Sequence, residues 1–171
     1  DPVAAHKLQA ESLAERLDAA DGGDMTDVFP GKPSELWEIR HHVSESLRQE
    51  GETLAFDVSV PRSSLAAFVD AARATVAAGW PFVRFCDYGH WGDGGVHVNL
   101  IWNPAEAPRP AAELKAELQP RLYDLAVTRF GGSYSAEHGI GPHNQAFYDL
   151  YTPGLVKEVC RLLKMRLDPA G

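Results

Sequence analysis

The stretch TLAFDVSV, residues 53–60, decides how the centre of this chain folds. Its large apolar residues fall on every second position: Leu54, Phe56, Val58 and Val60. Ala55, Asp57 and Ser59 lie between them. Successive side chains of a β-strand point to opposite faces, so this alternation predicts a strand with one face buried and the other open. Pro61 ends the strand.

Five further elements follow this strand, and each is predicted from its periodicity and its turn residues: a helix over 62–79, strands over 80–88 and 95–103, a helix over 110–132 kinked at Pro120, and a short strand over 133–137. The glycine-rich piece between the second and third strands predicts a hairpin. The order strand, helix, strand, strand, helix, strand is that of a split βαβ unit. The sequence therefore predicts an α+β, ferredoxin-like sandwich over about 53–137. Its antiparallel sheet has strand order 4-1-3-2 and carries helices on one face.

Helical periodicity also extends beyond this sandwich on both sides. The predicted flanking helices cover 2–21, 34–51, 143–151 and 153–166. We expect residues 1–171 to form a single domain. Because the chain starts at Asp1-Pro2 and stops just past a helix, we expect it to be a piece of a longer protein.

The bulk composition excludes several classes of protein. The 171 residues carry 16 basic and 24 acidic side chains, a net charge of −8, which argues against a nucleic-acid partner. No apolar run approaches the 18 residues that suggest a membrane span. The two cysteines, Cys86 and Cys160, suit a reducing compartment, and we expect a cytoplasmic protein that can lie at a membrane through an electron-acceptor partner.

The stretch HWGDGGVHVN, residues 90–99, is the first that could carry chemistry. If the valines of the third strand pack on the helices, then His97 and Asn99 point to the opposite face of the sheet. The hairpin can bring His90 back beside His97. Two histidines alone are weak grounds for a site, and polar residues that serve only the turn are the simpler interpretation.

A second stretch, GGSYSAEHGIG at residues 131–141, favours a functional site over a role in the turn alone. Glu137 and His138 follow the short fourth strand, and packing explains them poorly. In a sheet of order 4-1-3-2, Glu137 can meet His90 and His97 on the open face. Two histidines and one carboxylate can hold a zinc, manganese or iron ion with positions open for substrate. His138 would remain free as a general base.

Four motifs in order make the sequence familiar: FDVSVPRSSLAAFV, GHWGDGGVHVNL, GGSYSAEHGIG and the closing KMRLDPAG. They resemble the C-terminal domain of FAD-linked oxidases, in the vanillyl-alcohol oxidase superfamily. The nearest branch is that of the D-2-hydroxyacid dehydrogenases, which includes D-lactate dehydrogenase, the glycolate oxidase flavoprotein subunit and D-2-hydroxyglutarate dehydrogenase. The resemblance runs from about Leu36 to the C-terminus.

This resemblance implies a function and a set of roles. The domain would bind substrate while a separate N-terminal domain, absent from this chain, holds FAD and receives a hydride from the substrate α-carbon. It implies a divalent metal, zinc or manganese, on His90, His97 and Glu137, and a small 2-hydroxyacid as substrate. His138 would be the base, and the residues implied to contact substrate are Arg40, Ser44 and Asn99. A homodimer is a further possibility.

One position departs from the D-2-hydroxyglutarate enzymes, which carry a lysine two residues before the aspartate of DVSVP. Here that position is Ala55. The missing cation argues against a dicarboxylic substrate and favours a D-lactate or glycolate type. Two other functions stay open: a stand-alone metal enzyme with a two-His, one-carboxylate site, and a non-catalytic ferredoxin-like binding module.

Overall fold

The computed structural model describes residues 11–12, 15 and 31–170. Most of the predicted helix over 2–21 lies outside the described residues. The chain divides into two compact units, Asp1–Val43 and Ser44–Gly171, which are considered separately. Across the described residues, every helix is too short or too polar to cross a membrane.

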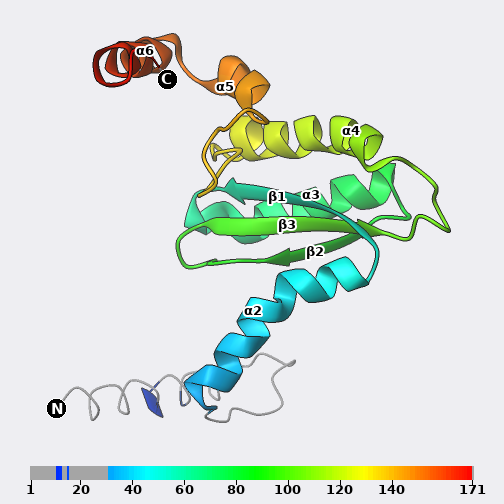
Figure 1. Cartoon of the computed structure of the whole chain (residues 1–171). Helices are drawn as coiled ribbons and strands as arrows, with labels where there is room; N and C mark the ends of the chain where they lie inside the picture. Colours follow the sequence, from blue (N-terminus) through cyan, green and yellow to red (C-terminus); the bar gives the residue numbers. More distant parts are fainter. Residues whose placement is uncertain (1–10, 13–14, 16–30, 171) are drawn as a thin grey trace. The chain divides into compact units, whose positions relative to one another are not determined.

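Three antiparallel strands form the sheet in the order β1-β3-β2, shown in Figure 1. They are β1 (Glu52–Ser59), β2 (Arg84–Tyr88) and β3 (Gly95–Trp102). The register sets Asp57 of β1 opposite His97 of β3, and Tyr88 of β2 opposite His97 on the other side. The central strand therefore carries His97 between two polar neighbours.

Two helices cover one face of this sheet (Figure 1). The first is α3 (Leu65–Gly79), which follows the short 3-10 turn η1 (Arg62–Ser64). The second is α4 (Ala111–Asp124) with its π-helical continuation η2 (Leu125–Arg129). The remaining described helices are α2 (Pro33–Gln49), α5 (Gln145–Tyr151) and α6 (Gly154–Leu167). The α+β, ferredoxin-like prediction is confirmed.

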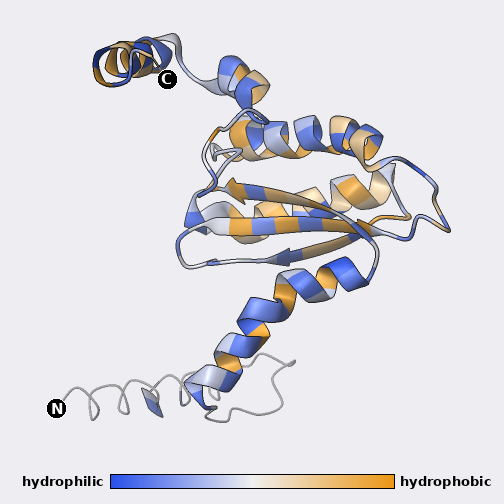
Figure 2. Cartoon of the chain, viewed as in Figure 1, coloured by the Kyte–Doolittle hydropathy of each residue, from blue (hydrophilic) through white to orange (hydrophobic). Residues whose placement is uncertain are grey.

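The core lies between the sheet and these two helices, as the alternation in the strands predicts. Side chains with almost no exposure come from every layer: Val58, Val96, Val98 and Leu100 from the sheet, Phe68 and Val76 from α3, and Leu114, Leu118 and Leu122 from α4. Figure 2 shows hydrophobic and hydrophilic residues following one another along β3. The hydrophilic positions belong to the face turned away from α3 and α4.

The predicted fourth strand differs from the observed structure. Residues 133–137 do run beside β1, but only Ser133 forms a bridge, with Ser59. Its two backbone hydrogen bonds measure 3.1 and 2.7 Å. Past this bridge the N–H groups of residues 136–138 bond the side chain of Asp57, and only that of Ala136 also bonds a backbone carbonyl of β1.

The predicted helix over 110–132 also changes form along its length. It stays α-helical through Pro120, and the change to π-helix begins at Leu125. The turn that follows brings Gly132 against β1, where its amide bonds the carbonyl oxygen of Ala126 at 2.8 Å. The second helix of the sandwich thus delivers residues 133–138 directly to the edge of β1.

Gly132→Ala is expected to destabilise the domain. A Cβ at this position would overlap the backbone oxygen of Ser59 and come within 2.7 Å of Val60 Cγ1. Forcing atoms into such a space costs about 1–3 kcal/mol, and here it also strains the only bridge between Ser133 and β1 among the described residues. Urea unfolding should show a lower free energy of unfolding.

Gly79→Ala is the matched control, because a Cβ there meets nothing within 4 Å. Its free energy of unfolding should stay within about 0.5 kcal/mol of the parent. Equal stabilities for the two variants would contradict the tight contact of Gly132 with β1.

Candidate metal and substrate site

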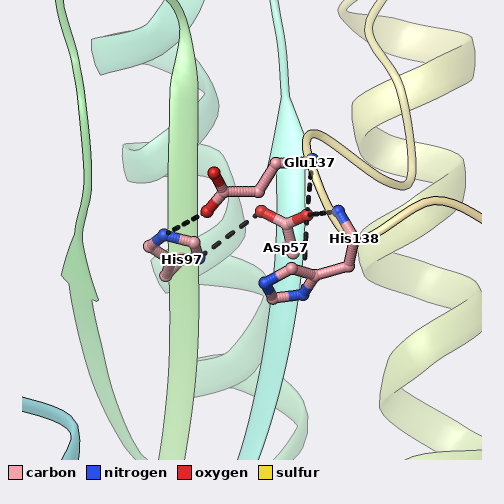
Figure 3. A group of neighbouring side chains, drawn as sticks. All are labelled: Asp57, His97, Glu137 and His138. Carbon is pink, nitrogen blue, oxygen red and sulfur yellow. Dashed lines mark hydrogen bonds and ion pairs between the residues drawn. The ribbon is translucent and has the colours of Figure 1, made fainter.

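The open face of the sheet carries a cluster of acidic and imidazole side chains, drawn in Figure 3. Asp57 on β1 and His97 on β3 stand opposite each other in the register. Glu137 and His138 come from the turn that follows the Ser133 bridge. Strand pairing supplies one half of the cluster and a loop supplies the other.

The turn at residues 136–138 is fixed by one carboxylate oxygen. Asp57 Oδ2 accepts hydrogen bonds from the backbone N–H groups of Ala136, Glu137 and His138, at 3.1, 2.8 and 3.0 Å. A further backbone bond runs from the Ala136 N–H to the Asp57 carbonyl at 3.3 Å. Hydrogen bonds to a charged acceptor are stronger than neutral ones, so they offset the cost of burying Asp57, which is only 7% exposed.

The imidazole of His97 lies between two carboxylates. Its Nδ1 is 3.4 Å from Asp57 Oδ1, and its Nε2 is 3.2 Å from Glu137 Oε1. His138 Nδ1 lies 3.7 Å from Asp57 Oδ2. The side chains range from 7% exposed at Asp57 and 17% at His97 to 59% at Glu137 and 68% at His138. The cluster therefore has a rigid buried side and an open side.

These donors fit a divalent ion. One ligand atom from each of Asp57, His97, Glu137 and His138 lies within 4.8 Å of all the others. Imidazole nitrogens and carboxylate oxygens suit zinc or manganese. In addition, Asp57 Oδ1 is buried and has no hydrogen-bond partner, which leaves negative charge facing the cluster.

His90 lies at this site but outside the tight group of converging ligand atoms. It lines the same pocket as Asp57, His97 and Glu137, together with Asp93. It is not one of the four residues whose ligand atoms converge within 4.8 Å. Its role as a metal ligand stays a prediction, as do the roles of His97 and Glu137.

Sequence reasoning missed Asp57. The signal that could have found it is the alternation of β1 itself, which already turned Asp57 to the same face as the histidine of the third strand. What spacing along the chain could not supply was the register that sets Asp57 beside His97.

The pocket has a volume of about 240 Å³. That is below the roughly 300–1,000 Å³ of sites that enclose drug-sized ligands, so it suits a small acid and not a dinucleotide such as FAD.

Comparison with known proteins gives the family. The family model described as "FAD linked oxidases, C-terminal domain" matches residues 1–171. The chain belongs to this family. It is also 30% identical over 166 residues to the mitochondrial D-2-hydroxyglutarate dehydrogenase of Danio rerio, covering 97% of this chain and 29% of that protein.

Other relatives agree with this assignment. The mitochondrial D-2-hydroxyglutarate dehydrogenase of Bos taurus is 32% identical over 155 residues, which cover 88% of this chain and 27% of that protein. The D-2-hydroxyglutarate dehydrogenase of Xanthomonas citri is 30% identical over 138 residues, covering 80% of this chain and 28% of that protein. This FAD-linked oxidase domain thus spans less than a third of each of these relatives, and the similarity confirms the D-2-hydroxyacid dehydrogenase branch.

The expected cytoplasmic location is wrong in the light of these relatives. The animal and plant enzymes are named mitochondrial, whereas the bacterial ones are not. Net charge and unpaired cysteines cannot separate one reducing compartment from another, because a cellular address is read from a targeting segment and not from the folded domain.

The three residues predicted to contact substrate lie in different settings. Asn99 is buried on β3, and its side-chain amide donates to the His97 carbonyl at 3.3 Å. Ser44 and Tyr88 share a hydroxyl–hydroxyl hydrogen bond of 2.6 Å. Arg40 lies on α2 in the other compact unit of this oxidase domain, so its role stays a prediction.

The Ser44–Tyr88 bond should appear as coupling in a double-mutant cycle. Ser44→Ala, Tyr88→Phe and the double variant should give an interaction energy of about 0.5–1.5 kcal/mol in urea unfolding, because the bond is short and partly buried.

A control cycle pairs Ser44→Ala with Thr75→Ala. The Thr75 hydroxyl bonds the Ala71 carbonyl within α3 and shares no partner with Ser44. That pair should be additive within about 0.3–0.5 kcal/mol. Additivity in the Ser44–Tyr88 cycle would mean that this hydrogen bond contributes no measurable stability, so that the Ser44 hydroxyl can turn to a substrate at no cost in stability.

Proposed function

We propose that this domain binds the substrate and a divalent metal ion for a flavin-dependent D-2-hydroxyacid dehydrogenase. The observation that carries the proposal is the convergence of Asp57, His97, Glu137 and His138 on the open face of the sheet, where the first three line a small pocket. Membership of the FAD-linked oxidases supports it. It also argues against the stand-alone metal enzyme and the non-catalytic module, because neither needs a flavin.

The proposed ligands are His97, Glu137 and His90. His97 Nε2 and Glu137 Oε1 already converge at 3.2 Å, and His90 lines the same pocket. Zinc or manganese fits this mixture of imidazole and carboxylate donors. When bound, the ion would supply Lewis acidity toward the substrate hydroxyl, and FAD in its own domain would supply the hydride acceptor.

The residues of this chain then have distinct tasks in the reaction. The α-carbon–hydrogen bond of the substrate breaks and its electron pair leaves as a hydride, while the hydroxyl proton leaves as H⁺ and a 2-oxoacid forms. His138, 68% exposed at its side chain, is the proposed acceptor of that proton. Asn99, Ser44 and Arg40 are the proposed contacts to the substrate's carboxylate and hydroxyl groups.

Two substrate classes compete within this function. Ala55 is exposed and pairs with Asn99 in the register, on the same face as Asp57, so this position supplies no cation for a second carboxylate. This favours a short monocarboxylic acid such as D-lactate or glycolate. The names of the relatives favour D-2-hydroxyglutarate, which is the second candidate.

Metal binding tests the proposal first. Calorimetric titration of the 171-residue chain with Zn²⁺ and with Mn²⁺ should give about one ion per chain, since the pocket holds a single converging donor set. His97→Ala and Glu137→Ala should each abolish measurable binding, because each removes one of the converging ligand atoms. His90→Ala should weaken binding if His90 completes the set.

His42→Ala is the matched control. His42 is exposed on α2, where its Nδ1 lies 2.8 Å from the Glu38 carbonyl oxygen, and its loss should leave the titration unchanged. No binding by the parent chain, or equal binding by the His97 and Glu137 variants, would reject the metal site. Turnover by this chain with Fe²⁺ and no flavin would instead establish the stand-alone enzyme.

Ala55→Lys tests the substrate class in a protein that joins this domain to its FAD-binding half. We expect flavin reduction to be more efficient with D-lactate or glycolate than with D-2-hydroxyglutarate. The variant should shift kcat/KM toward D-2-hydroxyglutarate by about tenfold, since a hydrogen bond to a charged group contributes about 1.5–3 kcal/mol.

Ala105→Lys is the control. Ala105 is exposed in the loop after β3, so this variant adds the same charge at a different place. A parent enzyme that already prefers D-2-hydroxyglutarate would show that another group binds the distal carboxylate.

A further inference from the structure

We propose that Asp57 is a positioning residue of the metal site and not one of its ligands. Its carboxylate holds His97 in the tautomer that carries hydrogen on Nδ1, so that the lone pair of Nε2 is directed at the ion. The same carboxylate holds the turn that presents Glu137 and His138. The metal part of this inference rests on the proposed function, whereas the tautomer does not.

The first step concerns Asp57 Oδ2. This oxygen accepts three backbone hydrogen bonds of 2.8–3.1 Å. A carboxylate oxygen has about two lone-pair positions, so three donors leave it no free lone pair for a cation. Binding an ion here would require the turn at 136–138 to open.

The second step concerns Asp57 Oδ1. This oxygen is buried and lacks a hydrogen-bond partner, yet His97 Nδ1 lies 3.4 Å away. Leaving a buried acceptor unpaired costs about 1–3 kcal/mol, more for a charged group, so a hydrogen on Nδ1 is strongly favoured.

The third step concerns the opposite edge of the ring. His97 Nε2 faces Glu137 Oε1 at 3.2 Å. A neutral imidazole with hydrogen on Nδ1 presents a lone pair at Nε2, and the carboxylate presents another. Two lone pairs at this separation repel unless a cation lies between them, so this edge is where a metal ion gains most.

Neighbouring rings restrict how far His97 can turn. The ring of Tyr88 lies 5.2 Å from it, centroid to centroid, and the ring of His138 lies 5.9 Å from it at an interplanar angle of 24°. A carboxylate behind a histidine that binds metal through its other nitrogen is a common support for metal sites. Figure 3 shows Asp57 between His97 and the backbone of the turn.

Asp57→Asn separates positioning from ligation. The amide oxygen can still accept the three backbone hydrogens, but its NH₂ group then faces His97 Nδ1 and donates to it. The hydrogen of the neutral ring should therefore move to Nε2, where it blocks the metal. Asp93→Asn is the matched control: Asp93 lines the same pocket, and its Oδ1 accepts the Gly95 N–H at 2.9 Å.

The readout is nitrogen NMR of the histidine rings in the metal-free 171-residue chain. In the spectrum of the neutral ring, His97 should show hydrogen on Nδ1 in the parent and in Asp93→Asn. In Asp57→Asn it should show hydrogen on Nε2. The Zn²⁺ affinity of Asp57→Asn should fall by about 10–100-fold, as is typical when such a support is removed.

Two results would overturn the inference: hydrogen on Nε2 of His97 in the parent, or an Asp57→Asn variant with the parent's tautomer and zinc affinity. The parent spectrum decides even if Asp57→Asn fails to fold, because hydrogen on Nδ1 supports the inference by itself. A parent that shows this tautomer but binds no zinc would reject the proposed metal function and leave the positioning of His97 in place.

Discussion

A buried carboxylate with three backbone amides on one oxygen links the fold of this domain to its chemistry. Segment 133–138 meets β1 through a single bridge, and glycines flank it on both sides. Backbone pairing alone would hold such a segment weakly. Asp57 replaces the missing ladder: it accepts the N–H groups of residues 136, 137 and 138 and fixes where their side chains emerge. These three bonds tie the backbone of Glu137 and His138 to the strand that pairs with His97.

One face of the sheet packs against the helices and stabilises the fold, and the other face carries the polar cluster. On the face covered by α3 and α4, apolar side chains such as Val58 and Leu100 are almost fully buried and keep the strands rigid. On the other face the same strands present Asp57 and His97 in a register that packing has already set. A site on paired strands is held more precisely than one on loops. Glu137 and His138 complete the cluster from the loop and have exposed side chains.

The sequence was enough to predict that Glu137 meets His97 on the open face of the sheet, but not that the Asp57 carboxylate connects the two. Alternation identified β1 and β3, and it turned His97 away from the core. The predicted strand at 133–137 failed because its N–H groups bond a side chain, which no pattern of apolar residues reports. Asp57 escaped notice for the same reason, since its partners lie about 80 residues away along the chain. The sequence placed His90 in the right pocket, but the four residues whose ligand atoms lie within 4.8 Å of one another include Asp57 and not His90.

The size of the pocket also limits which reactants of the proposed reaction this domain can hold by itself. Its volume of about 240 Å³ and its charged lining suit a small hydroxyacid and an ion, but not the cofactor that accepts the hydride. In the proposed reaction, this pocket would hold the ion and the acid, whereas the hydride would pass to a flavin held by another domain. The buried pair, Asp57 and His97, is organised before any ligand arrives. Glu137 and His138 have exposed side chains, but their backbone N–H groups bond Asp57 Oδ2, so the buried half of the site also fixes the backbone from which the exposed half extends.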